Sequence, residues 1–545
     1  MASLNEPSPK AHAPIERSRR QPRGVIALLV AVLAIVLAGT AGSAPHLLVG
    51  LARAAARDDV KIVGGAPTSL DPAAQGDIES AAVTGQLFES LTTFDSSLVL
   101  RPALAASWDV SNDGKQVIFH LRPNIVFSDG SPITADDVVG SWLRLVDPAA
   151  PSPLSALLLG VHGVADRLAG RSSDPSTVGI HARNGDIVVD LDRPGSDFPS
   201  VVASPSFGIL PPSVWRDRQA IPPTNQVVSG AYSITATSSS EITFTANPRY
   251  WGGPPAITTV HLIQDVGGRS PVTAFEAGDV DDVPIAANDA SWIAYDPMLG
   301  PQLRRIADLS VTYLGFDTSR PPFNDVRVRQ AVGEAVDWNR IVTLGASGGE
   351  VAATSMVPPG VPGRGDKSWL PVHDPAAARK LLSDAGYPGG SGFPTITLGA
   401  GGAEFAEGIV ADLQRELGIT VRIEDDTDHF ARLSTNPPAM WELGWIADYP
   451  GPNDFLGVLL GTGSSSNPGR WSSPAFDQAV SDALATRDPA TAQAAFERAL
   501  AVVQSDVPAV PLAYSDAWAL SRTGLLGAGE NGLGYKRFAS LAWAP

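Results

Sequence analysis

Few residues of this chain combine residue type and spacing in a way that could do chemistry. Gly345-Ala346-Ser347-Gly348-Gly349 fits the G-x-S-x-G pattern of a hydrolase nucleophile, and His373 and His429 lie downstream as candidate bases. Such a nucleophile needs a strand before it and a helix after it. Here a predicted helix precedes the motif and a loop pattern follows it, so we predict a flexible connection and no catalysis.

Candidate metal ligands do not gather in the sequence. The eight His residues show no i, i+4 pairing, and the chain contains no Cys. Neighbouring acidic residues such as Asp136-Asp137 and Asp281-Asp282 are typical of helix caps and solvated turns. No P-loop pattern is present. The sequence therefore predicts no metal, no cofactor and no ATP hydrolysis by this chain.

Among the acidic residues, Asp448 stands in the most distinctive stretch of sequence. It lies in Trp445-Ile446-Ala447-Asp448-Tyr449 and precedes Pro450-Gly451-Pro452. Asp is common in turns because its side chain binds backbone N–H groups. These residues alone favour a turn, and only the wider motif described below favours a binding site.

The surrounding sequence predicts an alternating α/β pattern. In segment 104–148, Asn112-Asp113-Gly114 predicts a turn, the alternating apolar residues of 117–122 predict a half-buried strand, and Thr134 with Asp137 forms a capping box at a helix start. Further strands are predicted at 61–63, 187–191, 241–246, 259–263, 395–398 and 420–423.

Three more helices have clear start signals. Asn324 or Asp325 caps a helix that continues through Val336 to Ile341. Asp374-Pro375 starts a helix that Gly386 ends, and Asp488-Pro489 starts a helix through Leu500.

Segment 104–148 resembles the signature segment of the family 5 extracellular solute-binding proteins, the oligopeptide, dipeptide and nickel receptors of ABC importers. Similar blocks follow in the family's order over most of the chain after residue 60: 68–72, 86–91, 230–232, 247–253, 321–331, 445–449 and 473–477. Blocks 321–331 and 445–449 are most similar to the oligopeptide-binding branch.

The resemblance implies an α/β fold of the two-lobed, periplasmic-binding-protein type II-like class, a clamp with an extra subdomain in the first lobe. Lobe I would take 57–100, 211–312 and 516–545, the extra subdomain 101–210 and lobe II 313–515, after a signal or anchor with its linker at 1–56. A ligand that contacts both lobes would favour the closed clamp.

The resemblance also implies a ligand site. In peptide-binding members the peptide lies extended between the lobes like an added strand, and a carboxylate meets its amino group. Asp448 matches that carboxylate, Trp445 would wall the same pocket, and Trp441, Glu442 and Tyr449 complete the predicted ligand-binding set.

Two positions depart from the oligopeptide-binding pattern. A basic residue that helps to meet the peptide carboxylate is replaced by Glu442, and a Tyr of the extra subdomain is replaced by Leu154. The ligand is then a peptide of different length, a cationic or modified peptide, or another small molecule.

Composition and the N-terminus limit the partners and the location. The net charge of -18 argues against nucleic acid. Arginines at 17, 19, 20 and 23 precede an apolar run at 24–44, which predicts an export signal, cleaved near 52–56 or retained as a transmembrane segment. The protein body should lie in the periplasm or at the cell surface. Without Cys, it is not a lipoprotein.

The sequence thus predicts an extracytoplasmic substrate-binding protein of an ABC importer, a monomer that binds oligopeptides between its lobes and delivers them to permease subunits in the membrane. The alternative is a non-transport cell-envelope regulatory or scaffold protein with the same fold, favoured by Glu442 and by the missing lipid anchor. A hydrolase comes third.

Overall fold

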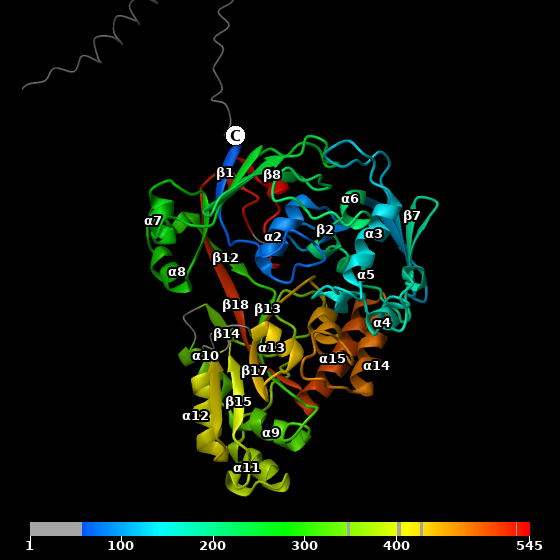
Figure 1. Cartoon of the computed structure of the whole chain (residues 1–545). Helices are drawn as coiled ribbons and strands as arrows, with labels where there is room; N and C mark the ends of the chain where they lie inside the picture. The colour runs from blue at the N-terminus through cyan, green and yellow to red at the C-terminus, as the bar shows by residue number, and fades with distance from the viewer. Residues whose placement is uncertain (1–56, 346–348, 401–404, 426–428, 530) are drawn as a thin grey trace, which may run out of the picture. The chain divides into compact units, whose positions relative to one another are not determined.

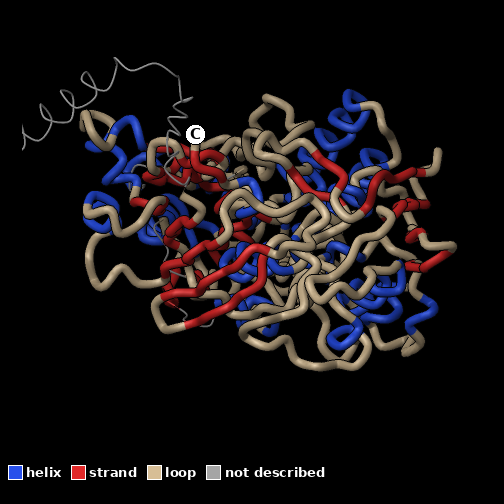
Figure 2. Tube along the Cα trace, turned by 90° about the horizontal axis from the view of Figure 1, so that it is seen from above, coloured by secondary structure: helices blue, strands red, loops and turns tan. Residues whose placement is uncertain are grey.

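A computed structural model describes residues 57–545 except 346–348, 401–404, 426–428 and 530. The described residues form one compact unit that combines helices and strands (Figure 1). Seen from above, the strands are flanked by helices and by long connecting loops (Figure 2). Ser347 of the G-x-S-x-G motif and the apolar run at 24–44 lie outside the described residues.

A strongly curled central sheet organises this unit. Its strands are ordered β16 (Val421–Asp425), β15 (Ile396–Ala400), β17 (Met440–Ile446), β13 (Ser310–Phe316), β18 (Ala509–Ser521), β11 (Asp282–Ile285), β1 (Asp59–Val63), β10 (Thr259–Ile263), β9 (Glu241–Ala246) and β8 (Tyr232–Thr237). The predicted strands at 241–246 and 259–263 are confirmed with the same bounds.

The long strand β18 belongs to both halves of this sheet. Residues 509–515 pair with β13 and with β14 (Glu350–Ala352). Residues 516–521 pair with β11 and with β12 (Leu303–Ala307). One uninterrupted backbone therefore joins the two parts of the sheet, as its course in Figure 1 shows.

A separate four-stranded sheet consists of β4 (Ala105–Val110), β5 (Gln116–Leu121), β7 (Asp186–Asp190) and β6 (Ile180–Arg183), in that order. The helix α3 (Ala135–Leu145) packs near it and begins with the predicted capping box, in which Thr134 and Asp137 bind each other's backbone N–H groups. Trp142 is fully buried in this core. Two small strand pairs, β2 (Thr92–Phe94) with β3 (Leu100–Pro102) and β19 (Leu525–Leu526) with β20 (Ala542–Trp543), complete the strands.

The other described α-helices begin and end as follows: α2 (Ile78–Leu87), α4 (Val164–Leu168), α5 (Phe198–Val201), α6 (Pro212–Trp215), α7 (Pro271–Glu276), α8 (Ala287–Ile293), α9 (Val326–Ala335), α10 (Trp338–Gly345), α11 (Pro375–Asp384), α12 (Ala406–Leu417), α13 (His429–Thr435), α14 (Pro474–Leu484) and α15 (Pro489–Asp506). Asp374 and Asp488 cap α11 and α15 as predicted.

The helix predicted to continue from Asp325 to Ile341 is in fact two helices, and this prediction was wrong. Val336 adopts an extended backbone that ends α9. Asp337 then accepts a hydrogen bond from the Arg340 N–H, at 3.1 Å, near the start of α10. The apolar spacing of Val336 and Ile341 satisfied helical periodicity, but the capping carboxylate starts a new helix.

Among the helices of the described residues, none combines the length and the apolar composition that crossing a bilayer requires.

Candidate functional site

Strand β17 leaves part of one edge unpaired. It pairs with β13 along its whole length, from Met440 to Ile446. On its other side β15 pairs only with Met440 and Trp441, and the Glu442 carbonyl accepts a bond from the His429 ring at 2.9 Å. Among the described residues, no strand covers 443–446 on that side. An unpaired edge of this kind is a template for a further strand.

The face of β17 next to this edge is open. Gly444 and Ile446 are exposed, and a Cβ placed on Gly444 would meet no atom within 4 Å. Glu442 is partly buried and, by strand alternation, lies on the same face as these two residues. An extended ligand would therefore run past Ile446, Gly444 and Glu442.

Asp448 lies just beyond β17 and shares its surroundings with Asp454. Its backbone N–H donates to Asp454 Oδ2 at 3.1 Å, and Trp445 Nε1 donates to the same oxygen at 3.0 Å. Asp454 begins the short π-helical segment Asp454–Val458 and is fully buried. The carboxylate of Asp454 thus fixes both the predicted wall residue and the backbone of the predicted amine-binding residue.

Both carboxylates keep an unsatisfied oxygen. Asp448 Oδ2 and Asp454 Oδ1 are buried and accept no hydrogen bond from the described part of the chain. Burial raises the pKa of Asp448 to about 7. Burial, and then the neighbouring Asp448, raise the pKa of Asp454 well above its usual range. An ionised carboxylate without a partner is costly to bury, so burial favours the protonated form of both groups, and a cation nearby would favour the ionised form.

A pocket of about 300 Å³ lies at the Ile446 end of β17. Its lining is mostly apolar and comes from β1, α2, β10 and the C-terminal residues 534–538, and includes Ile62, Val83, Leu262, Ile446, Tyr535 and Phe538. Glu79, Asp308 and Lys536 add polar groups. Tyr535, which lines this pocket, is also a residue on which the charge of Asp448 acts.

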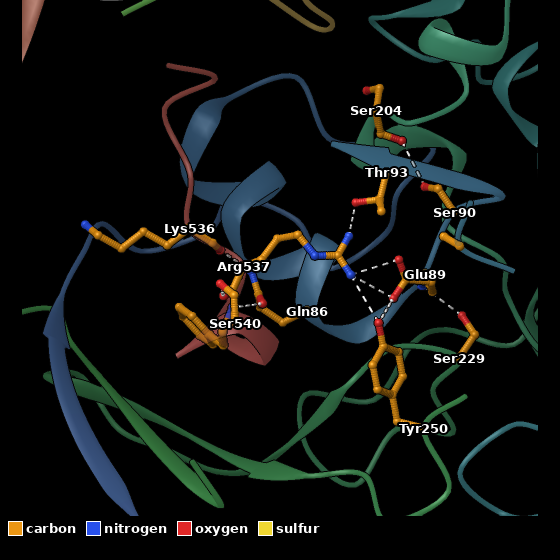
Figure 3. A network of polar contacts seen from close by, with 12 residues as sticks. Gln86, Glu89, Ser90, Thr93, Ser204, Ser229, Tyr250, Lys536, Arg537 and Ser540 are labelled. Atoms are coloured by element: carbon orange, nitrogen blue, oxygen red, sulfur yellow. Dashed lines mark hydrogen bonds and ion pairs between the residues drawn. The ribbon is translucent and has the colours of Figure 1, made fainter. Parts of the chain in front are cut away.

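Another buried carboxylate, that of Glu89, is fully satisfied (Figure 3). Arg537 Nη2 donates to both oxygens of Glu89 at 3.1 Å, and the Tyr250 hydroxyl donates to Glu89 Oε2 at 2.5 Å. Arg537 Nη1 also contacts the Thr93 hydroxyl. This cluster ties the C-terminal segment to α2 and β2, and so fixes Tyr535, two residues before Arg537.

The structure brings together only some of the predicted site residues. Trp445 and Asp448 meet through Asp454. Trp441 is 2% exposed and packs in the sheet against Gly315. Tyr449 is fully buried and points to another part of the chain, where its hydroxyl donates to Asp197 Oδ2 at 2.7 Å.

The chain is similar to known proteins over most of its length. Residues 99–467 match the family model described as bacterial extracellular solute-binding proteins, family 5 Middle. The chain belongs to this family. Membership of the family 5 solute-binding proteins places the chain among binding proteins and not among enzymes.

Curated members of the family are similar over most of their length. The periplasmic oligopeptide-binding protein OppA of Salmonella typhimurium is 28% identical over 509 residues, which cover 89% of this chain and 92% of the relative. The probable deoxycholate-binding periplasmic protein YgiS of Escherichia coli is 28% identical over 473 residues, covering 82% of this chain and 86% of YgiS.

Solved structures confirm the predicted fold class, the α/β two-lobed clamp. The murein tripeptide-binding protein MppA of Escherichia coli superposes with a TM-score of 0.77 at 24% identity, covering 90% of this chain and 99% of MppA. The Haemophilus influenzae OppA complex with RPPGFSPFR superposes with a TM-score of 0.74 at 23% identity, covering 90% and 99%.

Sequence reasoning missed the residues that complete the site. Asp454 follows Asp448 by six residues, and only the π-helical turn brings the two carboxylates together. Tyr535 and Arg537 come from the C-terminal segment, far away in sequence. The one available signal was that the acidic residue Asp454 follows closely after the predicted turn at 450–452.

Proposed function

We propose that this protein is an extracytoplasmic receptor for oligopeptides, which it delivers to the membrane permease of an ABC importer. The observation that carries the proposal is a buried carboxylate without a cation, Asp448, at the end of a strand with an unpaired edge. A peptide supplies both missing partners, because its main chain can extend the sheet and its terminal ammonium can pair with Asp448. The relative of Salmonella typhimurium that is named periplasmic oligopeptide-binding protein OppA supports the ligand class.

The energetics favour a charged ligand terminus at Asp448. A buried ion pair with one partner removed is destabilised by ~3–5 kcal/mol, so the unliganded site carries a cost that a cation relieves. A peptide that pairs with Asp448 in lobe II and also contacts lobe I would favour the closed clamp.

The lobe boundaries expected from the sequence form part of this proposal: lobe I at 57–100, 211–312 and 516–545, the extra subdomain at 101–210 and lobe II at 313–515. The change of partners along β18 supports the junction at 516, because Ser515 pairs with β14 and Asp516 with β12. The separate four-stranded sheet, which lies entirely between residues 105 and 190, supports the extra subdomain.

The family is extracytoplasmic, and we propose that the run at 24–44 exports this member. Arginines before an apolar run retain the positive flank on the cytoplasmic side. The segment is then either a cleaved signal peptide or a membrane anchor, and N-terminal sequencing of the mature protein distinguishes the two.

The decisive experiment is ligand discovery. Residues 57–545 are purified, bound small molecules are identified by mass spectrometry under denaturing conditions, and melting shifts are measured with peptide pools. Ligand at about 100 times its Kd adds ~2.7 kcal/mol to the free energy of unfolding. Bound peptides and a melting shift are expected, and the absence of both would reject peptide transport.

One observation favours a second ligand class. The pocket lining is mostly apolar, and the relative YgiS is named as probably deoxycholate-binding. Glu442, where peptide-binding members carry a basic residue, also weakens recognition of a peptide carboxylate. A melting shift with bile acids and none with peptides would support this apolar ligand class. No melting shift with either would support the scaffold role.

A further inference from the structure

Asp454 lies next to Asp448, the proposed amine-binding residue. It is fully buried, and its Oδ1 accepts no hydrogen bond from the described residues. Its other oxygen holds Trp445 and the backbone of Asp448 at 3.0 and 3.1 Å. Asp454 is therefore adjacent to Asp448, and each of the two side chains keeps one buried oxygen unused.

The groups that act on this pair do not neutralise it. Asp197, Tyr449 and Tyr535 are titratable groups that interact with this pair, and all three are acids. Among the described residues, no Lys, Arg or His forms an ion pair with Asp448 or Asp454. By contrast, Glu89 has its own guanidinium from Arg537. Two adjacent carboxylates with one cation between them keep a net charge of one or share a proton.

We propose that Asp454 binds ligand directly and that the Asp448–Asp454 pair selects a ligand end with two positive charges, such as a peptide whose first residue is Lys or Arg. The α-ammonium pairs with one carboxylate and the basic side chain with the other. A doubly charged end leaves both carboxylates ionised and neutralised, whereas a singly charged end leaves one of them protonated or unpaired. This selectivity rests on the proposed function, in which the site receives a peptide terminus.

The test compares ligands that differ in one charge. L-Lysinamide carries an α-ammonium and an ε-ammonium, and L-norleucinamide has a similar side chain without the second charge. The peptides Lys-Ala-Ala and norleucyl-Ala-Ala make the same comparison for a peptide. Calorimetry on the full chain at pH 7, where the α-amino groups are mostly protonated, should show each doubly charged ligand binding at least about tenfold more tightly than its partner.

Asp454→Asn removes the charge and keeps an oxygen that can accept from Trp445 Nε1 and from the Asp448 N–H. The variant should lose the preference for the second charge and still bind norleucyl-Ala-Ala. Asp448→Asn should weaken all four ligands. Circular dichroism confirms that each variant is folded.

A wild-type preference below twofold, or a preference that persists in Asp454→Asn, overturns the inference and leaves peptide binding intact. If lysinamide binds with an Asp454-dependent preference and neither peptide binds, the inference stands and the proposed function fails. Should Asp454→Asn not fold, the wild type decides the matter alone. Its preference for the second charge must then shrink as the pH falls from about 7 to about 5, because protonation of the pair removes the second negative charge. A constant preference rejects the role of the pair.

Discussion

Glu89 and the Asp448–Asp454 pair are buried acidic groups of the same compact unit, and their hydrogen-bond partners differ. Glu89 receives a guanidinium on both oxygens and a phenol on one of them. The aspartate pair has two unused oxygens and no cation among the described residues. Both lie close to the C-terminal segment, through Arg537 and Tyr535.

We attribute this difference to two roles. The Glu89 carboxylate stabilises the fold, and the Asp448–Asp454 pair serves ligand binding. Where the C-terminal segment must be held, the protein supplies the cation itself. At the end of β17 it omits the cation, so the free protein bears the cost of two buried carboxylates. Binding sites are often unstable in this sense, since stability and function compete at the same residues.

The largest expected effect comes from removing Arg537, the cation that pairs with Glu89. Arg537→Ala leaves Glu89 buried with no cation, and should lower the free energy of unfolding by ~3 kcal/mol or more. Urea denaturation measures the change. The double variant Arg537→Ala/Glu89→Gln should recover part of the loss, and a loss below ~1 kcal/mol in the single variant would contradict the structural role of the pair.

Neutralising Asp448, which has no cation partner among the described residues, should affect ligand binding and not folding. Asp448→Asn should weaken peptide affinity by 2–5 kcal/mol, or about thirtyfold or more, because the ligand ammonium loses its buried partner. Its free energy of unfolding should be unchanged or higher. Asp109→Asn, whose side chain is 79% exposed on another sheet, is the control. Unchanged affinity in Asp448→Asn would refute the amine-binding role.

The two sides should also differ in their response to pH. Burial raises the pKa of Asp448 from 3.8 to about 7, so the folded state favours the protonated form. The stability that this group contributes is complete below about pH 4 and is lost as the pH rises through about 7. A cationic ligand favours the ionised form, so its affinity should rise over the same range.

Calorimetry between pH 5 and pH 8 and urea denaturation over the same range measure these two slopes. In Asp448→Asn both slopes should be smaller than in the wild type. Equal slopes in the two proteins would show that other groups cause the pH dependence.

The smallest effect concerns the open face of β17. Gly444→Val adds a side chain where no atom lies within 4 Å, so the free energy of unfolding should change by less than about 0.5 kcal/mol. Peptide affinity should fall about fivefold, because the new side chain occupies the ligand path. Gly315→Ala is the matched control, since its Cβ would lie 2.4 Å from Trp441 and should reduce stability. Unchanged peptide affinity in Gly444→Val would show that the ligand does not pass over this face.

The sequence predicted the elements wherever local chemistry determines them. The Thr134 capping box, the Asp374 and Asp488 caps and strands β9 and β10 are confirmed. The break at Val336 was missed because apolar periodicity continued across it. The family blocks supplied the fold class, which periodicity alone does not determine.

The site was only partly predictable for a physical reason. Asp448 and Trp445 stand in one strand motif, so their proximity follows from the sequence. Asp454 joins them through an irregular helical turn, and Tyr535 arrives from the far end of the chain. Tertiary contacts of this kind leave no local pattern. The roles of Trp441, Glu442 and Tyr449 in ligand binding stay predictions, as do the lobe boundaries.

Strand β18 has a consequence for how this molecule can vary. Its thirteen residues form ladders with β13 and β14 at one end and with β11 and β12 at the other. Deletion of a single residue in the middle would reverse the inside and outside of every side chain beyond it, in one half or the other. The partners at both ends therefore fix the length of β18. We expect insertions and deletions to be tolerated better in surface loops than in this strand.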